Sequence, residues 1–129
     1  MRRRAFAVAL LGFFLMSCGV DNQAPSIPSQ TWKAIEVSVE TRPVVVSPGM
    51  NEFLVITTRK PKRPVFDLVV SMRMNESDPW KQAIQDGHVG VYRRSLMVTD
   101  PAAQTLFVHI KQKEEETVLR FPLKGRPLP

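Results

Sequence analysis

The chain has 129 residues, a formal net charge of +6 and a single cysteine, and 43% of its residues are hydrophobic. This length suits one small domain behind a short leader, and a single cysteine excludes a disulfide within the chain. The basic residues do not alternate with aromatic residues along any stretch. The composition therefore does not favour a nucleic-acid-binding surface.

The first seventeen residues have the layout of an export signal. Three arginines at positions 2–4 precede an apolar run over 5–16, and Ser17 lies directly before Cys18. This run has 12 residues, whereas a membrane-spanning helix needs about 20. A basic segment, a short apolar segment and a small residue before the cleavage point predict a secretory signal peptide over 1–17.

Leu15-Met16-Ser17-Cys18 resembles the lipobox of a bacterial lipoprotein signal. The resemblance implies cleavage before Cys18 and acylation of its thiol and new amino group, including palmitate, which leaves no free thiol. Gly19 stands where an aspartate would retain a lipoprotein at the inner membrane, so the outer membrane is favoured if the organism has two. Arg3-Arg4-Ala5-Phe6 is a partial twin-arginine pattern, but it lacks most of the remaining residues of that signal, so the twin-arginine route is disfavoured. We expect a membrane-anchored protein that faces the periplasm or the cell exterior.

Removal of the leader leaves 112 residues with 15 basic and 12 acidic side chains, so the mature net charge is +3. Residues 19–30 are polar, contain two prolines and show no hydrophobic periodicity. Residues 18–30 are therefore predicted to be the lipidated cysteine and a flexible tether, and the folded domain is expected over 31–129. The basic cluster Arg59-Lys60-Pro61-Lys62-Arg63 indicates either a solvated loop or contact with anionic lipid headgroups or an acidic partner.

Short strands are predicted from Trp32 onward. Ile35, Val37 and Val39 alternate with polar residues, which is typical of a strand with one wet face. Ser47-Pro48-Gly49 predicts a tight turn, and 113–116 a charged loop that joins the last two strands as a hairpin. The expected strands are 35–40, 44–46, 51–58, 65–74, 88–98, 105–111 and 117–123, and in 65–74 one face carries Phe66, Leu68, Val70, Met72 and Met74.

One segment has helix signals instead. Asp78 can cap a helix, Pro79 suits the first helical position, and Gly87 suits the residue just past the end. The pattern predicts about two turns of helix over 78–87. Trp80, Ala83 and Ile84 would then face the domain, because positions i, i+3 and i+4 share one side of a helix.

Together these elements predict an all-β, immunoglobulin-like antiparallel β-sandwich of six to seven strands with one short helix. Three motifs resemble the small periplasmic domains of the YtkA/FixH type: Val46–Asn51 (VSPGMN), Val69–Met74 (VVSMRM) and Asp86–Tyr92 (DGHVGVY). The resemblance spans roughly residues 35–123 and implies a domain linked to metal handling and to assembly of membrane oxidases. That family commonly has a glycine-tryptophan pair before the penultimate strand, where this chain has Gln104-Thr105.

Candidate metal ligands are few. Thioether and imidazole groups suit copper(I), and these groups are carried by Met72, Met74, Met97, His88 and His109. Met72, Met74 and His88 form the predicted copper set, on the expectation that they converge at one end of the sandwich. In the alternative, which requires no cofactor, Met72 and Met97 fill the core and His109 faces solvent from a strand.

We predict that the chain is not an enzyme. Asp86 and His88 lie close together in the sequence and Ser95 is a candidate nucleophile, yet no nucleophile elbow, zinc-binding helix or phosphate loop occurs, and Asp86 is explained by the predicted helix-ending turn. An interaction surface is expected instead, since tryptophan, tyrosine and arginine are enriched at binding hot spots. We predict that it is bordered by Trp80, Asp86, Gly87, His88, Tyr92 and Arg93. The predicted function is an envelope lipoprotein that binds or scaffolds another envelope component, and the alternative is a copper-handling accessory of oxidase assembly.

Overall fold

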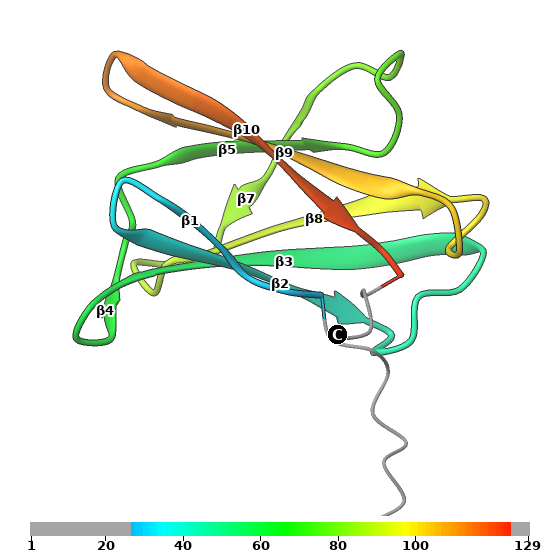
Figure 1. The fold of residues 1–129 in the computed structure, drawn as a ribbon, viewed down its shortest axis with the longest axis horizontal. Helices are drawn as coiled ribbons and strands as arrows, with labels where there is room; N and C mark the ends of the chain where they lie inside the picture. The colour runs from blue at the N-terminus through cyan, green and yellow to red at the C-terminus, as the bar shows by residue number, and fades with distance from the viewer. Residues whose placement is uncertain (1–26, 125–129) are drawn as a thin grey trace, which may run out of the picture.

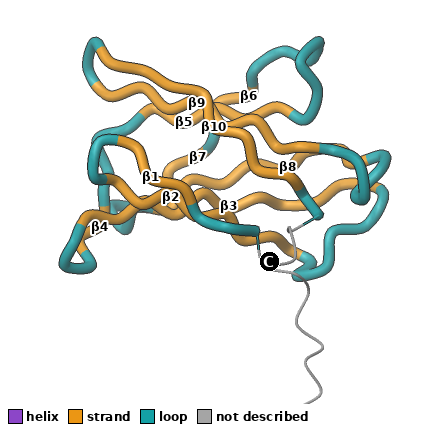
Figure 2. Tube along the Cα trace, in the orientation of Figure 1, coloured by secondary structure: helices purple, strands orange, loops and turns teal. Residues whose placement is uncertain are grey.

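The computed structural model describes residues 27–124, and within this range all regular structure is β-strand (Figures 1 and 2). The strands are β1 (Gln30–Trp32), β2 (Ile35–Arg42), β3 (Gly49–Arg59), β4 (Arg63–Pro64), β5 (Val69–Arg73), β6 (Lys81–Gln82), β7 (Ile84–Gln85), β8 (Val91–Val98), β9 (Thr105–Gln112) and β10 (Glu115–Pro122). The predicted signal peptide, Cys18 and most of the predicted tether lie outside the described residues. β1 begins at Gln30 and Ile27 packs on the core, so ordered structure starts a few residues before position 31.

Two antiparallel sheets form a β-sandwich. One sheet has the order β1-β2-β3-β8-β7, with β4 on the free part of β3, and the other has the order β10-β9-β5-β6. One hydrophobic cluster between the sheets draws residues from both, including Phe53 and Val55 from the first sheet and Met72, Val108 and Ile110 from the second. Burial of each such side chain contributes about 1.5–3 kcal/mol. The predicted all-β sandwich is confirmed.

Several strand predictions are confirmed in detail. Ile35, Val37 and Val39 of β2 all face the core, as their alternation predicts. β9 and β10 pair along their full lengths, from Glu115 opposite Gln112 to Pro122 opposite Thr105. The predicted number of strands is too small, because β1, β4, β6 and β7 are edge pieces of two or three residues. Strands of two or three residues are too short to show the alternation of hydrophobic and polar residues from which a strand is predicted.

Two strand predictions are wrong. Residues 44–46 form no strand, and Val44 and Val45 are exposed. Pro43 lacks the N–H that a ladder needs, so β2 ends at Arg42. β5 begins only at Val69, because 65–68 crosses from one sheet to the other. Phe66 is therefore exposed, although Leu68, Val70, Met72 and Met74 are buried as predicted.

The predicted helix over 78–87 is also wrong. Gln82 pairs with Ser71 on β5, whereas Ile84 pairs with Arg93 on β8, so this segment steps from the edge of one sheet to the edge of the other. Ala83 is buried at the step and donates its N–H to the Val70 carbonyl at 2.8 Å. A two-turn helix is marginal on its own, and two open sheet edges offer its backbone better partners. Ile84 is consequently exposed.

The crossing segment 65–68 is held by side chains from both of its neighbours. The Thr57 hydroxyl donates to the Val65 carbonyl at 2.8 Å, and the Val65 N–H donates to the Thr57 carbonyl at 3.0 Å. The Tyr92 hydroxyl also donates to the Val65 carbonyl, at 3.1 Å, and accepts the Leu68 N–H at 3.3 Å. Tyr92 is only 2% exposed. These bonds fix the crossover over one edge of the core.

Because of Tyr92, the sandwich is expected to lose stability at alkaline pH. Burial raises the pKa of Tyr92 above its ordinary value of 10.0; the Leu68 hydrogen bond lowers it and the nearby Asp67 carboxylate raises it further. A pKa raised on folding gives stability that is complete below pH 10.0 and is lost as the pH rises through the folded value. Because Tyr92 is the only tyrosine, we expect tyrosinate absorbance to appear together with unfolding.

Tyr92→Phe is the matched variant for this prediction. We expect it to be about 1–3 kcal/mol less stable at neutral pH, because the Leu68 N–H loses its partner and the Val65 carbonyl keeps only the Thr57 hydroxyl. It should then lose less stability than the wild type between neutral and strongly alkaline pH in denaturant titrations. Ionisation of Tyr92 at its ordinary pKa in a still folded chain would contradict the prediction.

The antiparallel pairing decides which loops share an end of the sandwich. We call one end the terminal end: it holds Ile27, Lys124 and the loops 43–48, 74–80 and 99–104. Gln104 ties these segments together, since it donates to Asn75 at 3.3 Å and accepts the Leu123 N–H at 3.1 Å. The opposite end, here the basic end, holds the turns 33–34, 60–62, 86–90 and 113–114 (Figure 1). In the described part of the chain, no helix has the length and apolar character needed to span a bilayer.

Candidate functional site

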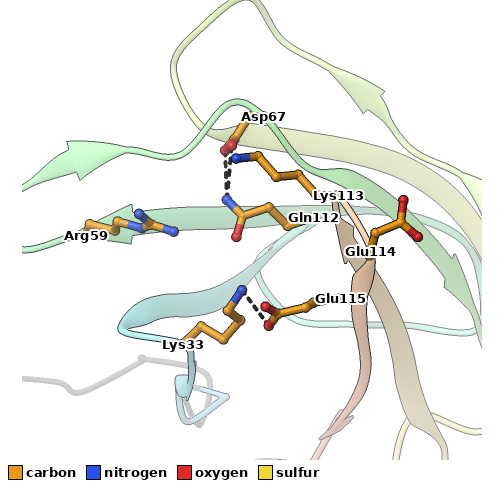
Figure 3. Close-up of a pocket in the computed structure, with 7 residues that line it drawn as sticks. All are labelled: Lys33, Arg59, Asp67, Gln112, Lys113, Glu114 and Glu115. Carbon is orange, nitrogen blue, oxygen red and sulfur yellow. Dashed lines mark hydrogen bonds and ion pairs between the residues drawn. The ribbon is translucent and has the colours of Figure 1, made fainter.

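A hollow of about 490 Å³ opens at the basic end, and the positive and negative side chains that line it are equal in number. It is lined by Lys33, Arg59, Asp67, Gln112, Lys113, Glu114 and Glu115 (Figure 3). Lys33 pairs with Glu115 at 2.5 Å, and the Gln112 amide donates to the Asp67 carboxylate at 3.0 and 3.2 Å. Three cations face three carboxylates, so the hollow has no net charge with which to select an ionic ligand.

The outer face of the four-stranded sheet carries a different arrangement. Arg73 on β5 lies opposite Phe107 on β9, which lies opposite Arg120 on β10. Trp80 directly precedes β6 and so extends the same line across the sheet edge. We call these four residues the arginine–aromatic row. Phe107 belongs to this outer face because its neighbours Leu106 and Val108 both point into the core.

The row is held together by cation–π contacts. The Arg73 guanidinium lies 4.1 Å from the centroid of the Trp80 ring and 5.8 Å from that of Phe107. The Arg120 guanidinium lies 5.7 Å from Phe107 on the other side. Contacts of this kind contribute about 0.5–1 kcal/mol at exposed sites and more where water is excluded. The side chains are therefore pre-arranged before any partner binds.

His109 links the row to a second line of residues. Its ring lies 5.6 Å from the Trp80 ring, and its Nε2 lies 3.2 Å from a Glu116 carboxylate oxygen. Val69 and Val118, on the same face, are both substantially exposed. The face thus mixes flat aromatic rings, aliphatic side chains and guanidinium groups, which is the composition of protein-binding surfaces.

The electrostatic balance of this face is positive. Along β5, β9 and β10, Arg73, Lys111 and Arg120 point outward with Glu116 as the one carboxylate among the described outward residues. The Arg73 charge is poorly compensated: its Nε is buried without a hydrogen bond in residues 27–124, and a terminal nitrogen donates to the Asp78 carbonyl at a long 3.4 Å. A half-buried guanidinium with so few hydrogen-bond partners favours an incoming carboxylate at its accessible nitrogens.

The structure does not bring the predicted contact residues to one surface. Trp80 lies on the outer face of the four-stranded sheet, whereas Arg93 lies on the outer face of the other sheet, opposite Ile84. Asp86, Gly87 and His88 lie on an exposed turn at the basic end, where His88 packs edge-on against Phe66 at 5.2 Å. Tyr92 is in the core, so its side chain cannot border a surface.

The predicted copper ligands are also dispersed. Met72 and Met74 are buried in the core, 0% and 3% exposed, near the terminal end of β5, whereas His88 lies at the basic end. Met97 is exposed on the outer face of the six-stranded sheet, and His109 lies half-buried on the other. Thioethers in the core pack as apolar side chains. Residues 27–124 contain no cluster of three or more histidine, cysteine or acidic residues arranged to hold a metal.

Arg73, Phe107 and Arg120 were not predicted from the sequence. The alternation along each strand predicts that these side chains lie on the outer face of the sheet. Their alignment, however, depends on the pairing register of three strands, and the residues are up to 47 positions apart in the sequence. Of the four residues in the row, only Trp80 was predicted from the sequence, because tryptophan is enriched at binding hot spots. No family model matches the chain, and neither curated proteins nor solved structures provide a match.

Proposed function

We propose that this chain is a non-enzymatic lipoprotein of the cell envelope that binds another envelope protein through the arginine–aromatic row. The leader and Leu15-Met16-Ser17-Cys18 support the anchor and a location in the periplasm or at the cell exterior, with the outer membrane favoured in a two-membrane organism. The observation that carries the binding function is the row itself: Arg73, Phe107 and Arg120 are aligned across three neighbouring strands, and Trp80, just before β6, extends the line.

We further propose that the sandwich is immunoglobulin-like. The orders β2-β3-β8-β7 and β10-β9-β5-β6 correspond to the A-B-E-D and G-F-C-C′ arrangements of that fold. This strand order supports the assignment without the disulfide and core tryptophan of antibody domains. The resemblance to YtkA/FixH domains stays a prediction, and the buried positions of Met72 and Met74 give its copper function no support.

The partner we propose is a protein with an acidic, partly apolar segment. A carboxylate would compensate the Arg73 guanidinium, and apolar side chains would cover Trp80 and Val118. Tryptophan and arginine in such surroundings are the residue types whose truncation costs most at interfaces. The excess of outward cations along β5, β9 and β10 would speed the encounter with such a segment.

A photo-crosslinking residue at Gln82, in the full chain in its native membrane, provides the test. Gln82 pairs with Ser71 on the outer face beside Trp80. We expect a specific adduct, and with the purified partner we expect Trp80→Ala and Arg73→Ala each to weaken affinity by at least about 2 kcal/mol, about 30-fold.

Arg93→Ala is the matched control, because Arg93 is an exposed arginine on the outer face of the opposite sheet. It should leave affinity unchanged, and thermal unfolding should show that all three variants stay folded. Equal loss with Arg93→Ala, or no loss with either row variant, would refute the row as the binding surface.

A further inference from the structure

Exposed apolar side chains gather at the terminal end of the six-stranded sheet. Val44 and Val45 are 74% and 62% exposed on the loop between β2 and β3, and Met50 and Met97 are 58% and 55% exposed. Met50 and Met97 lie directly opposite each other on β3 and β8, one residue from the end of that pairing. We call these four residues the apolar end patch. Exposed apolar groups that gather in this way mark interaction sites.

The loop that presents the two valines is structurally fixed. Buried Asn51 accepts the Ser47 N–H at 3.2 Å and donates to the carbonyls of Ser47 and Gly49 at 2.7 and 3.0 Å. The Thr41 hydroxyl donates to the Val44 carbonyl at 3.0 Å, and Val46 packs against the core. Because both ends of the loop are tied down, Val44 and Val45 are held outward rather than free to fold back on the core.

We propose that the apolar end patch rests on the membrane that carries the Cys18 lipid, so that the sandwich stands with its terminal end on the bilayer. This inference rests on the proposed lipid anchor. The first described residues run toward this end, since β1 is antiparallel to β2 with Gln30 opposite Val37, so that residues 27–29 continue toward the Arg42 end of β2. Eight residues lie between Cys18 and Ile27, and a chain of this length reaches at most about 30 Å. Once the lipid is inserted, partial insertion of apolar side chains adds to the binding.

The basic end is the competing candidate for lipid contact. Its arginines and lysines at 59–63 follow β3, which has 11 residues and so is about 36 Å long. Electrostatic attraction to a charged surface falls off over about 8 Å at physiological ionic strength. With the terminal end on the bilayer, the basic turn therefore faces away from it. The arginine–aromatic row stands beside the membrane, in the half of its sheet nearer the terminal end.

Depth-dependent fluorescence quenching on the full lipidated chain tests this orientation. Because Cys18 is acylated, Val45→Cys supplies a single thiol for an environment-sensitive fluorophore, and Met97→Cys supplies a second reporter on a strand. Val89→Cys is the matched control, since Val89 is 57% exposed at the basic end. The chain is placed in vesicles of phosphatidylethanolamine and phosphatidylglycerol that contain lipids with a doxyl quencher on the upper acyl chain.

We expect the labels at positions 45 and 97 to be quenched several-fold more strongly than the label at 89, with emission shifted to the blue. Equal quenching at all three positions, in a chain whose amino-terminal peptide carries acyl mass, would overturn the orientation and leave the lipid anchor standing. An amino-terminal peptide without acyl mass, together with a chain that does not float with the vesicles, would overturn the anchor and this inference together.

Discussion

Gly90→Ala is expected to lower the free energy of unfolding by about 2–5 kcal/mol. Gly90 has a φ of +74°, a region that costs an alanine about 1–2 kcal/mol. A Cβ at this position would also lie 2.6 Å from the Thr57 carbonyl oxygen and 3.1 Å from Pro64 and Val65. Backbone cannot yield as a flexible side chain does, so overpacking adds about 1–3 kcal/mol. The added methyl group would disturb the contact between the start of the crossing segment and the turn before β8.

Gly87→Ala separates these two causes. Gly87 has a similar φ of +62°, but a Cβ there meets nothing within 4 Å. This control should therefore lose only the backbone cost, about 1–2 kcal/mol. Urea titrations of both variants measure the difference, and unchanged slopes would show that the denatured state is the same. If both variants lost the same free energy of unfolding, the close approach of a Cβ at position 90 to the Thr57 carbonyl oxygen would contribute nothing to the destabilisation.

Cys18→Ser is expected to abolish lipid attachment completely. A serine hydroxyl cannot take the place of the acylated thiol, and each buried methylene of the lost chains contributes about 0.8 kcal/mol to membrane binding. Labelled palmitate should enter the wild-type chain and not the variant, and any variant chain cut at the leader should leave the membrane fraction. The apolar end patch alone is too small to hold a folded domain on a bilayer.

Ser17→Ala is the control, because alanine keeps the small residue that the cleavage site requires. It should take up palmitate and stay with the membranes as the wild type does. Palmitate incorporation into Cys18→Ser would refute the lipobox, and loss of palmitate from both variants would show that the leader as a whole, rather than the thiol, was disturbed.

The failed helix prediction shows how neighbouring strands override local signals. Asp78, Pro79 and Gly87 are sound capping residues, yet such signals stabilise a short helix by only about 1 kcal/mol each. The open edges of β5 and β8 offer this segment hydrogen bonds at two places, with Ala83 buried between them. The position of those edges depends on residues far along the chain, so no local pattern reports it.

The predicted copper ligands do not converge in the structure, for a related reason. Met72 and His88 are 16 positions apart, and the expectation that they converge assumed that two strand ends meet at one end of the sandwich. The antiparallel order instead directs the Met74 end of β5 and the turn before β8 to opposite ends. Alternation along a strand predicts the face on which a side chain lies, but the direction of each strand follows from the complete pairing order.

The sequence by itself determined the all-β class and the inward residues of β2 and β5, because each of these depends on neighbours within a few residues. Only the tertiary structure decided that Arg73, Phe107 and Arg120 form a row with Trp80, and that Val44 and Val45 share an end with Met97. The physical reason is that cross-strand register comes from the joint packing of both sheets on one core, in which residues distant along the chain contribute together.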